Sequence, residues 1–499
     1  MATWTRRAVL GAGALGALSA CTSTGSDTSA STPGPTPSPS PSTSPSPSGR
    51  VPWPQLRRSV QGTLARPGDP AYDQVRLLQN PRYDGERPLA VLSVGSEQDV
   101  ATGLSFARDH DLPIAIRSGG HSYPGWSGGG SPRALVIDCR PLDRVQVSGA
   151  TATVGAGAAL AHVYEEIGGR GRAIAGGSCP TVGISGLTLG GGVGVLTRAM
   201  GLTCDAVRSM RVVTADGTLR TASADDEPDL SWALRGGGGG HLGVVTSFEF
   251  ETTAAPTISS VYLQWPLSAA ADVIAAWFDW APTADARLWS TLKALGGAEH
   301  AGSPILLLSG TWTGPTGALD AQLAGLLDHV PAPSVRSDHV RAYLEAMQAY
   351  AGAGGREAFA ATSHVAYDAL TAAGIADLVD QVQAAQASGL KEAGVSIDAL
   401  GGKVRDLGPG DTAFVHRTAL ATVQYTATFP PGTPRAADAY VRGFRAAMLP
   451  HWGNHAYVNY SDATIADYRT AYFGDNADRL AQVRSAYDPD GFFTQPQDF

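Results

Sequence analysis

The sequence predicts an α+β fold, in which strands and helices are not arranged as regular βαβ units. No strand is followed by a glycine-rich turn and helix with an acidic residue at the spacing of a dinucleotide-binding fold. The composition changes near residue 252, where a second series of strand and helix patterns begins. With 499 residues, 43% of them hydrophobic, the chain is long enough for several domains with substantial cores.

Residues 1–21 have the pattern of an export signal. Thr5-Arg-Arg-Ala-Val-Leu10 resembles a twin-arginine signal, and the apolar stretch 8–20 is too short to span a bilayer comfortably. Leu18-Ser-Ala-Cys21 resembles a lipobox, so we expect Cys21 to carry a lipid anchor. The chain would then lie on the outer face of the cytoplasmic membrane, or be secreted if the lipobox is not used.

Residues 22–49 are almost entirely Ser, Thr, Pro and Gly. Such a segment buries too little apolar surface to compensate for the entropy lost on ordering. We therefore expect a disordered linker between the anchor and the folded chain.

The first folded region, residues 50–252, contains mostly short strand patterns. Ser96-Glu-Gln-Asp99 has the form of a capping box and predicts a helix through Phe106. Asp216-Gly217 predicts a hairpin turn between two strands within 207–221. A short helical segment at 229–235 precedes five glycines at 236–240. The other predicted strands are 87–93, 113–117, 134–138, 144–147, 151–155 and 244–250.

The second region, residues 253–445, is expected to form a separate domain, and residues 446–499 a C-terminal segment that is again aromatic and polar. Strand patterns occur at 259–265, 305–311 and 419–429. Helical patterns occur at 268–280, 317–328, 338–350 and 372–388.

Charge and cysteine content exclude several classes of protein. A formal net charge of −9 argues against a nucleic-acid partner, which requires a basic surface. No apolar run reaches the length of a transmembrane helix. Four cysteines are too few for a disulfide framework in a chain this long, although export would permit Cys139 and Cys204 to pair.

Two glycine-rich segments carry the most informative side chains: His121 in Arg117-Ser-Gly-Gly-His-Ser122, and Cys179 in Ser178-Cys-Pro-Thr-Val-Gly-Ile-Ser-Gly186. Glycine allows a planar ligand to approach the backbone closely. A metal site would require further ligands beside each residue, and none is present, so we expect no metal. A Cys–His hydrolase, a purely structural role and covalent attachment of a cofactor remain open.

At this point several segments resemble the berberine bridge enzyme-like family of FAD-linked oxidases. The two segments above are similar to its flavin-attachment motifs, and residues 187–201 and 229–240 are similar to other motifs of the family. Tyr457-Val-Asn-Tyr460 and Tyr487-Asp-Pro489 are also similar to motifs of this family. The resemblance covers roughly residues 65–499 and is weakest across 255–400.

The resemblance implies an FAD-binding domain of the vanillyl-alcohol-oxidase type with two subdomains, completed by the C-terminal segment. A substrate domain with an antiparallel sheet covered by helices would lie between. It implies that His121 bonds to the 8α methyl of FAD and Cys179 to ring carbon 6. The N–H groups of 118–122 would hold the pyrophosphate, because successive amides in such loops bind anions. The implied cofactor-binding residues are Arg117, Ser118, Gly119, Gly120, His121, Ser122, Cys179, Val182, Gly183, Gly186, Gly190, Gly191, Val245 and Asn459.

The resemblance further implies an enzyme that takes hydride from a sugar hemiacetal, alcohol or related C–H donor and reduces O2 to H2O2. Tyr457 would be the catalytic base and Gln424 would line the substrate pocket. Thr422 stands where we align a catalytic Glu of plant members, which puts their mechanism in doubt for this chain. The small Val182 favours access of O2 to the flavin. We expect a monomer.

Two other functions fit the same resemblance. A flavin dehydrogenase would pass electrons to a quinone or another redox partner. A surface binding protein would keep FAD without turnover.

Overall fold

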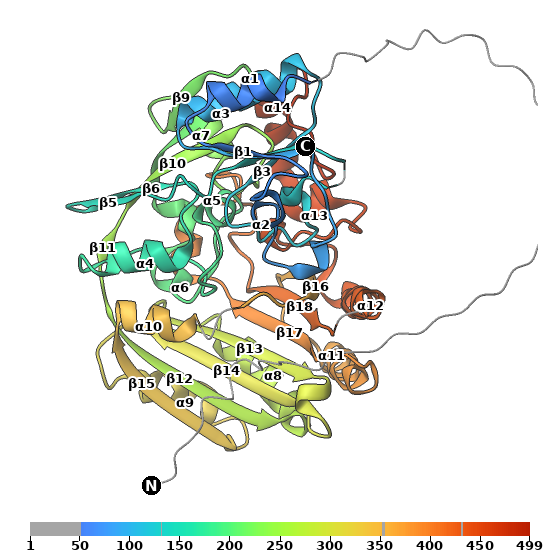
Figure 1. Cartoon of the computed structure of the whole chain (residues 1–499). Helices are drawn as coiled ribbons and strands as arrows, with labels where there is room; N and C mark the ends of the chain where they lie inside the picture. Colours follow the sequence, from blue (N-terminus) through green and yellow to red (C-terminus); the bar gives the residue numbers. More distant parts are fainter. Residues whose placement is uncertain (1–50, 131, 352–354, 431–432) are drawn as a thin grey trace, which may run out of the picture.

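The structure is a computed structural model that describes residues 51–130, 132–351, 355–430 and 433–499 (Figure 1). The predicted signal, linker and anchor at Cys21 lie outside the described residues. The fold is α+β, as the sequence predicts.

The first region contains two sheets, which form two subdomains. One has four strands in the order β1-β2-β4-β3, with β2, β4 and β3 parallel and β1 antiparallel to β2. The other has five antiparallel strands in the order β5-β6-β10-β8-β9. The strand patterns predicted here are confirmed. The bounds are β1 Thr63–Ala65, β2 Ala90–Ser93, β3 Ile114–Arg117, β4 Leu135–Asp138, β5 Val145–Ser148, β6 Thr151–Gly155, β8 Val207–Val213, β9 Leu219–Ser223 and β10 Val244–Glu251.

Helix α3 (Glu97–Asp109) begins as the capping box predicts, because Ser96 Oγ accepts a hydrogen bond from Asp99 N at 3.2 Å. Its apolar face buries Val100 and Leu104 in one core cluster with residues of β2 and β4. A short ladder joins β7 (Arg172–Ala173) to β11 (Thr253–Ala254). The remaining helices are α1 Trp53–Ser59, α2 Tyr72–Val75, α4 Leu160–Gly168, α5 Ile184–Leu189, α6 Thr197–Met200 and α7 Pro228–Ala233.

The second region is built on a seven-stranded antiparallel sheet in the order β15-β12-β14-β13-β17-β18-β16. One face of the sheet is apolar and shares a core with four helices, whose buried residues include Trp277, Leu323, Leu378 and Phe444. These helices lie along the lower and right sides of the sheet in Figure 1. The strands are β12 Thr257–Pro266, β13 Leu288–Gly296, β14 Ile305–Trp312, β15 Val335–Ala342, β16 Phe359–Ala366, β17 Glu392–Ala399 and β18 Ala421–Thr428. The helices are α8 Ala270–Trp280, α9 Leu319–Leu327, α11 Ala372–Ala384 and α12 Pro434–Trp452.

The helix predicted over 338–350 is wrong in its first half. Residues to Ala342 belong to β15, which pairs with β12 along its whole length, and only α10 (Tyr343–Tyr350) is helical. β15 is an edge strand whose charged residues, such as Arg336 and Asp338, are exposed. Charges protect an edge strand from further pairing, and they give it the polar spacing of a surface helix.

The C-terminal part returns to the first region. Helix α12 packs in the core of the seven-stranded sheet through Val441 and Trp452, and it ends at Trp452. Helix α14 (Ala477–Tyr487) then contacts α7, and α13 (Tyr468–Phe473) contacts α14 (Figure 1). In the described part of the chain no helix has both the length and the apolar content to cross a membrane.

Candidate active site

The two glycine-rich loops of the sequence meet directly. The first follows β3, and the second leads into α5. A Cβ added at Gly183 would lie 2.1 Å from Ser118 Oγ and 2.2 Å from Gly119 N, so the backbones are in contact. Ser118 Oγ also donates to Ala156 O at 2.6 Å, which fixes the first loop against the end of β6. Glycine at both positions is what allows the loops to approach this closely.

His121 and Cys179 lie on either side of Thr181. The Thr181 hydroxyl is 2.9 Å from His121 Nε2 and 3.8 Å from Cys179 Sγ. Burial lowers the pKa of His121 to about 4, so the imidazole is neutral near neutral pH. Its Nδ1 makes no hydrogen bond to any described residue, and the Cys179 thiol is exposed. Both nucleophilic atoms are therefore available to a ligand that reaches between them.

The loop after β3 also presents unpaired backbone donors. The N–H groups of residues 118–122 donate to no acceptor among the described residues, while the Gly120 carbonyl accepts from Gln79 N at 3.1 Å. Gly120 has a φ of +76°, which a residue with a side chain rarely adopts. Such a run of free amides binds anions. A cavity of about 390 Å³ adjoins the loops at Gly119 and Thr181, and its polar lining is Gln74, Gln79, Arg140, Asp143, His162 and Arg356.

Arg117 lies at the start of the loop after β3, and its contacts are with the surrounding backbone and Asp138. Its guanidinium is fully buried and donates to Asp138 Oδ2 at 3.0 Å and to the carbonyls of Val75 and Arg76. Arg117 thus joins β3 to β4 and to the segment after α2. The predicted residue Val245 is likewise buried, in the core beside β8, and the structure brings neither side chain to His121 or Cys179.

Other predicted glycines approach the segment that carries Asn459. A Cβ on Gly190 would lie 2.1 Å from Asn459 Oδ1, and Gly191 has a φ of +117°. Asn459 Nδ2 donates to Leu187 O at 2.9 Å, which orients the amide. The structure therefore brings Asn459 to α5, and its role at a cofactor stays a prediction. Ser122 and Val182 are half-buried in the two loops, and Gly186 has no atom near its missing side chain.

Tyr457 is 1% exposed, and its hydroxyl oxygen has three hydrogen-bond donors. It accepts hydrogen bonds from Gly192 N at 3.0 Å, Val193 N at 3.3 Å and Asn459 Nδ2 at 2.9 Å. Burial raises the pKa of Tyr457 to about 12, and the three donors act in the opposite direction. The side chain is thus held firmly but faces backbone rather than open space.

Tyr460, three residues further on, is half-buried and stacks on Tyr123 with ring centroids 5.5 Å apart. The Gln424 amide donates to the Tyr123 hydroxyl. Gln424 therefore points toward this tyrosine pair, and its place in a substrate pocket stays a prediction. The hydroxyl of the neighbouring Thr422 is buried and has no partner among the described residues.

Asp398 on β17 completes this cluster. It lies opposite Thr422 on β18 and Thr291 on β13. Burial raises the pKa of the Asp398 carboxyl. Burial raises the pKa of Tyr460 as well, and the nearby charge of Asp398 adds to this effect. Asp398 thus contributes to the electrostatic environment of Tyr460.

Three of these residues were not selected in the sequence. Tyr123 follows His121 by two positions and Tyr460 closes the Tyr-Val-Asn-Tyr segment, so their places in those motifs could have indicated them. Asp398 gave no such signal, because β17 was not predicted as a strand. Within the described residues no group of three or more His, Cys, Asp or Glu side chains could hold a metal ion. Cys139 and Cys204 are both buried free thiols.

Comparisons with known proteins agree with this architecture. The family described as "FAD binding domain" matches residues 88–223, and "Berberine and berberine like" matches residues 456–498. The FAD-linked oxidoreductase YgaK of Bacillus subtilis is 30% identical over 449 residues, which cover 88% of this chain and 96% of the relative. The chitooligosaccharide oxidase of Gibberella zeae is 28% identical, over 82% of this chain and 87% of its own. The solved structure of Physcomitrella patens BBE-like 1 superposes with a TM-score of 0.81 at 25% identity, covering 89% of this chain and 98% of that one.

Proposed function

The chain belongs to the berberine bridge enzyme-like family of FAD-linked oxidoreductases, and from this premise we propose that it is an oxidase of sugar hemiacetals or related alcohols. In this reaction the substrate carbon loses a hydride and its hydroxyl loses a proton, which leaves a carbonyl group. The two electrons and two protons released reduce one O2 to H2O2. The observation that carries the proposal is the arrangement of His121, Cys179 and free loop amides beside a cluster of Tyr460, Asp398 and Gln424.

We propose that FAD is attached at both His121 and Cys179. The neutral His121 ring with an unbonded Nδ1 and the exposed Cys179 thiol are suited to bonds with the 8α methyl and ring carbon 6. Each bond replaces one C–H of the flavin and one N–H or S–H of the protein, and the two electrons released pass to O2. The amides of 118–122 and the polar cavity beside them suit the pyrophosphate and adenosine.

Bound FAD would supply two kinds of chemistry: it would accept a hydride from the substrate and transfer two electrons to O2. The protein must remove the hydroxyl proton of the substrate. We propose that Tyr460 Oη accepts this proton as it passes its own proton to Asp398, because burial keeps the Tyr460 phenol protonated and the charge of Asp398 acts on it. Gln424 orients the neighbouring Tyr123. Tyr457 is the alternative base, and its three N–H donors favour the ionised form of its phenol.

A carbohydrate is the substrate class that fits best. The sheet face that carries Asp398 also carries Ser396 and Gln424, with Lys293 in register beside them. Such a row of hydroxyl, amide and charged groups suits a ligand rich in hydroxyls. The Gibberella zeae relative is a chitooligosaccharide oxidase, which supports an oligosaccharide as the class to test first.

Location and partners follow from the sequence. We propose export by the twin-arginine route and anchoring through a lipid on Cys21, with the enzyme monomeric and O2 as its second substrate. Val182, close to Cys179, is small and favours O2 over a quinone or protein acceptor.

Anaerobic mixing with a panel of mono- and oligosaccharides, followed by air, tests the function. We expect bleaching of the flavin absorbance by at least one sugar, then rapid recovery with stoichiometric H2O2. Bleaching followed by slow recovery would indicate a dehydrogenase. An absence of bleaching by any sugar, alcohol or amine would indicate a flavin-bearing binding protein and contradict the proposal.

A further inference from the structure

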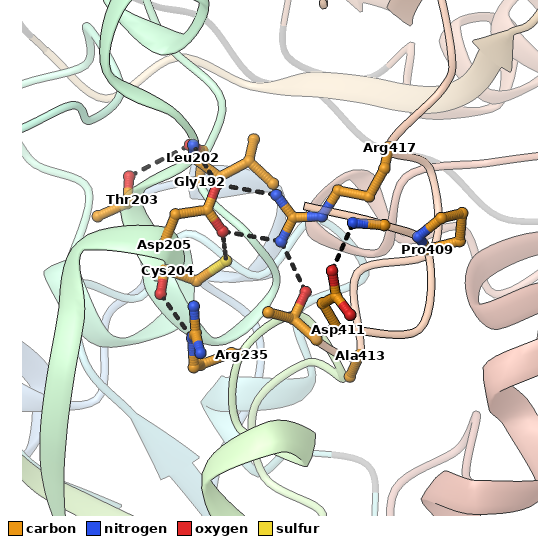
Figure 2. A network of polar contacts seen from close by, with 12 residues as sticks. Gly192, Leu202, Thr203, Cys204, Asp205, Arg235, Pro409, Asp411, Ala413 and Arg417 are labelled. Atoms are coloured by element: carbon orange, nitrogen blue, oxygen red, sulfur yellow. Dashed lines mark hydrogen bonds and ion pairs between the residues drawn. The ribbon is translucent and has the colours of Figure 1, made fainter. Parts of the chain in front are cut away.

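A buried ion pair joins the substrate domain to the first region near Tyr457. Arg417, from the loop before β18, is fully buried and donates from both terminal nitrogens to Asp205 at 2.7 and 2.8 Å (Figure 2). It also donates to Thr412 Oγ1 at 2.6 Å. A buried bidentate pair fixes orientation, and removal of one partner would leave a buried charge without compensation.

Asp205 uses the same carboxylate to hold a turn. Its Oδ2 accepts from Leu202 N at 2.8 Å, at the start of the 3-10 helix Thr203–Ala206. The N–H of Thr203 donates to Gly192 O at 3.0 Å, and the N–H of Cys204 donates to Gly191 O at 2.9 Å. Thr203 Oγ1 adds a second hydrogen bond to Gly192 O at 3.2 Å. Figure 2 shows this turn between Gly192 and Arg417.

The two carbonyls held by the turn belong to the peptide groups that bind Tyr457. The peptide between Gly191 and Gly192 accepts at its carbonyl from Cys204 and donates at its N–H to the Tyr457 oxygen. The next peptide accepts from Thr203 and donates through Val193 N. A peptide that accepts at one end is a stronger donor at the other, because hydrogen bonds in a chain polarise one another.

We propose that Asp205 and Arg417 are a positioning pair for the Tyr457 hydroxyl, acting through the 202–204 turn and the two peptide groups that follow Gly191. They hold both N–H groups within hydrogen-bond distance of the oxygen, while Asn459 donates from its own amide. The three donors together fix the position of the Tyr457 oxygen. The inference rests on the proposed function, since it makes Tyr457 an oriented group of that site.

Fluorine NMR of the flavin-loaded protein containing 3-fluorotyrosine tests the pair. The chain has 15 tyrosines, so the Tyr457 resonance is assigned as the one lost in Tyr457→Phe. We expect Asp205→Asn to shift this resonance in the same direction as Asn459→Ala, which removes one direct donor. Asp205→Glu should restore part of the shift. Thr203→Val, which keeps the ion pair and removes only the hydroxyl donor, should give a smaller shift of the same sign.

The matched control is Asp438→Asn. It breaks another ion pair between the two regions, in which Arg82 Nη2 donates to both oxygens of Asp438 and which has no contact with Tyr457. In Asp438→Asn the Tyr457 resonance should not move. If Asp205→Asn fails to fold, the shift of the Tyr457 resonance in Thr203→Val tests the inference instead. An unmoved resonance in the folded variants, or an equal shift in Asp438→Asn, overturns the inference. The resonance is read without turnover, so failure of the oxidase proposal would show separately as a lack of flavin reduction.

Discussion

Replacement of Gly183 by valine is expected to abolish most flavin incorporation and to destabilise the fold. A Cβ at this position would lie 2.1 Å from Ser118 Oγ and 2.2 Å from Gly119 N, and the backbone atom cannot move away without shifting the whole loop. Overpacking of this kind costs about 1–3 kcal/mol or more. The loss of loop geometry should strongly lower the flavin-to-protein absorbance ratio, because His121 and Cys179 would no longer be held where attachment is proposed. Urea unfolding measures the stability change.

Gly443→Ala is the matched control at a glycine outside the candidate site. No atom lies within 4 Å of its missing side chain, and Gly443 is inside α12. Alanine is favoured over glycine in helices by about 1 kcal/mol. Flavin content should be unchanged and stability equal or higher. Equal flavin loss in both variants would show that the loss does not depend on the contact between the two loops.

Tyr460→Phe is expected to slow anaerobic reduction of the flavin by about 10²–10⁴-fold, the usual contribution of a general base. Phenylalanine keeps the ring that stacks on Tyr123, so flavin content and stability should stay close to those of the unaltered protein. Stopped-flow absorbance with a saturating sugar measures the rate. Asp398→Asn should give a loss of similar size, because the carboxylate acts together with the Tyr460 hydroxyl.

Two further variants, compared with Tyr460→Phe, test whether Tyr460 is the base. Tyr123→Phe removes the hydroxyl that Gln424 contacts, so we expect it to raise KM more than it lowers the limiting rate. A larger rate loss in Tyr457→Phe than in Tyr460→Phe would make Tyr457 the base and contradict the assignment to Tyr460.

Features that depend on local sequence were predictable. The capping box located the start of α3, and the Asp216-Gly217 turn located the β8–β9 hairpin. The loops of His121 and Cys179 carry their own glycines, and the close approach of these two segments follows from Gly119 and Gly183.

Features that depend on pairing between distant strands were not predictable. Asp398 enters the site only because β17 lies between β13 and β18, which places it opposite Thr422. The edge strand β15 has a polar pattern that resembles a surface helix, and only its ladder with β12 determines its conformation. The direction of the Tyr457 hydroxyl likewise depends on Gly192 and Val193, which are distant from it in the sequence.

The attachment of flavin at both His121 and Cys179 is tested most directly by acid precipitation of the unaltered protein, His121→Ala, Cys179→Ala and the double variant. Flavin absorbance in the washed pellet is the measurement. We expect the pellet to stay yellow for the unaltered protein and for each single variant, because one bond suffices to retain the cofactor, and to be colourless for the double variant. Release of all flavin into the supernatant by the unaltered protein would contradict attachment at either residue.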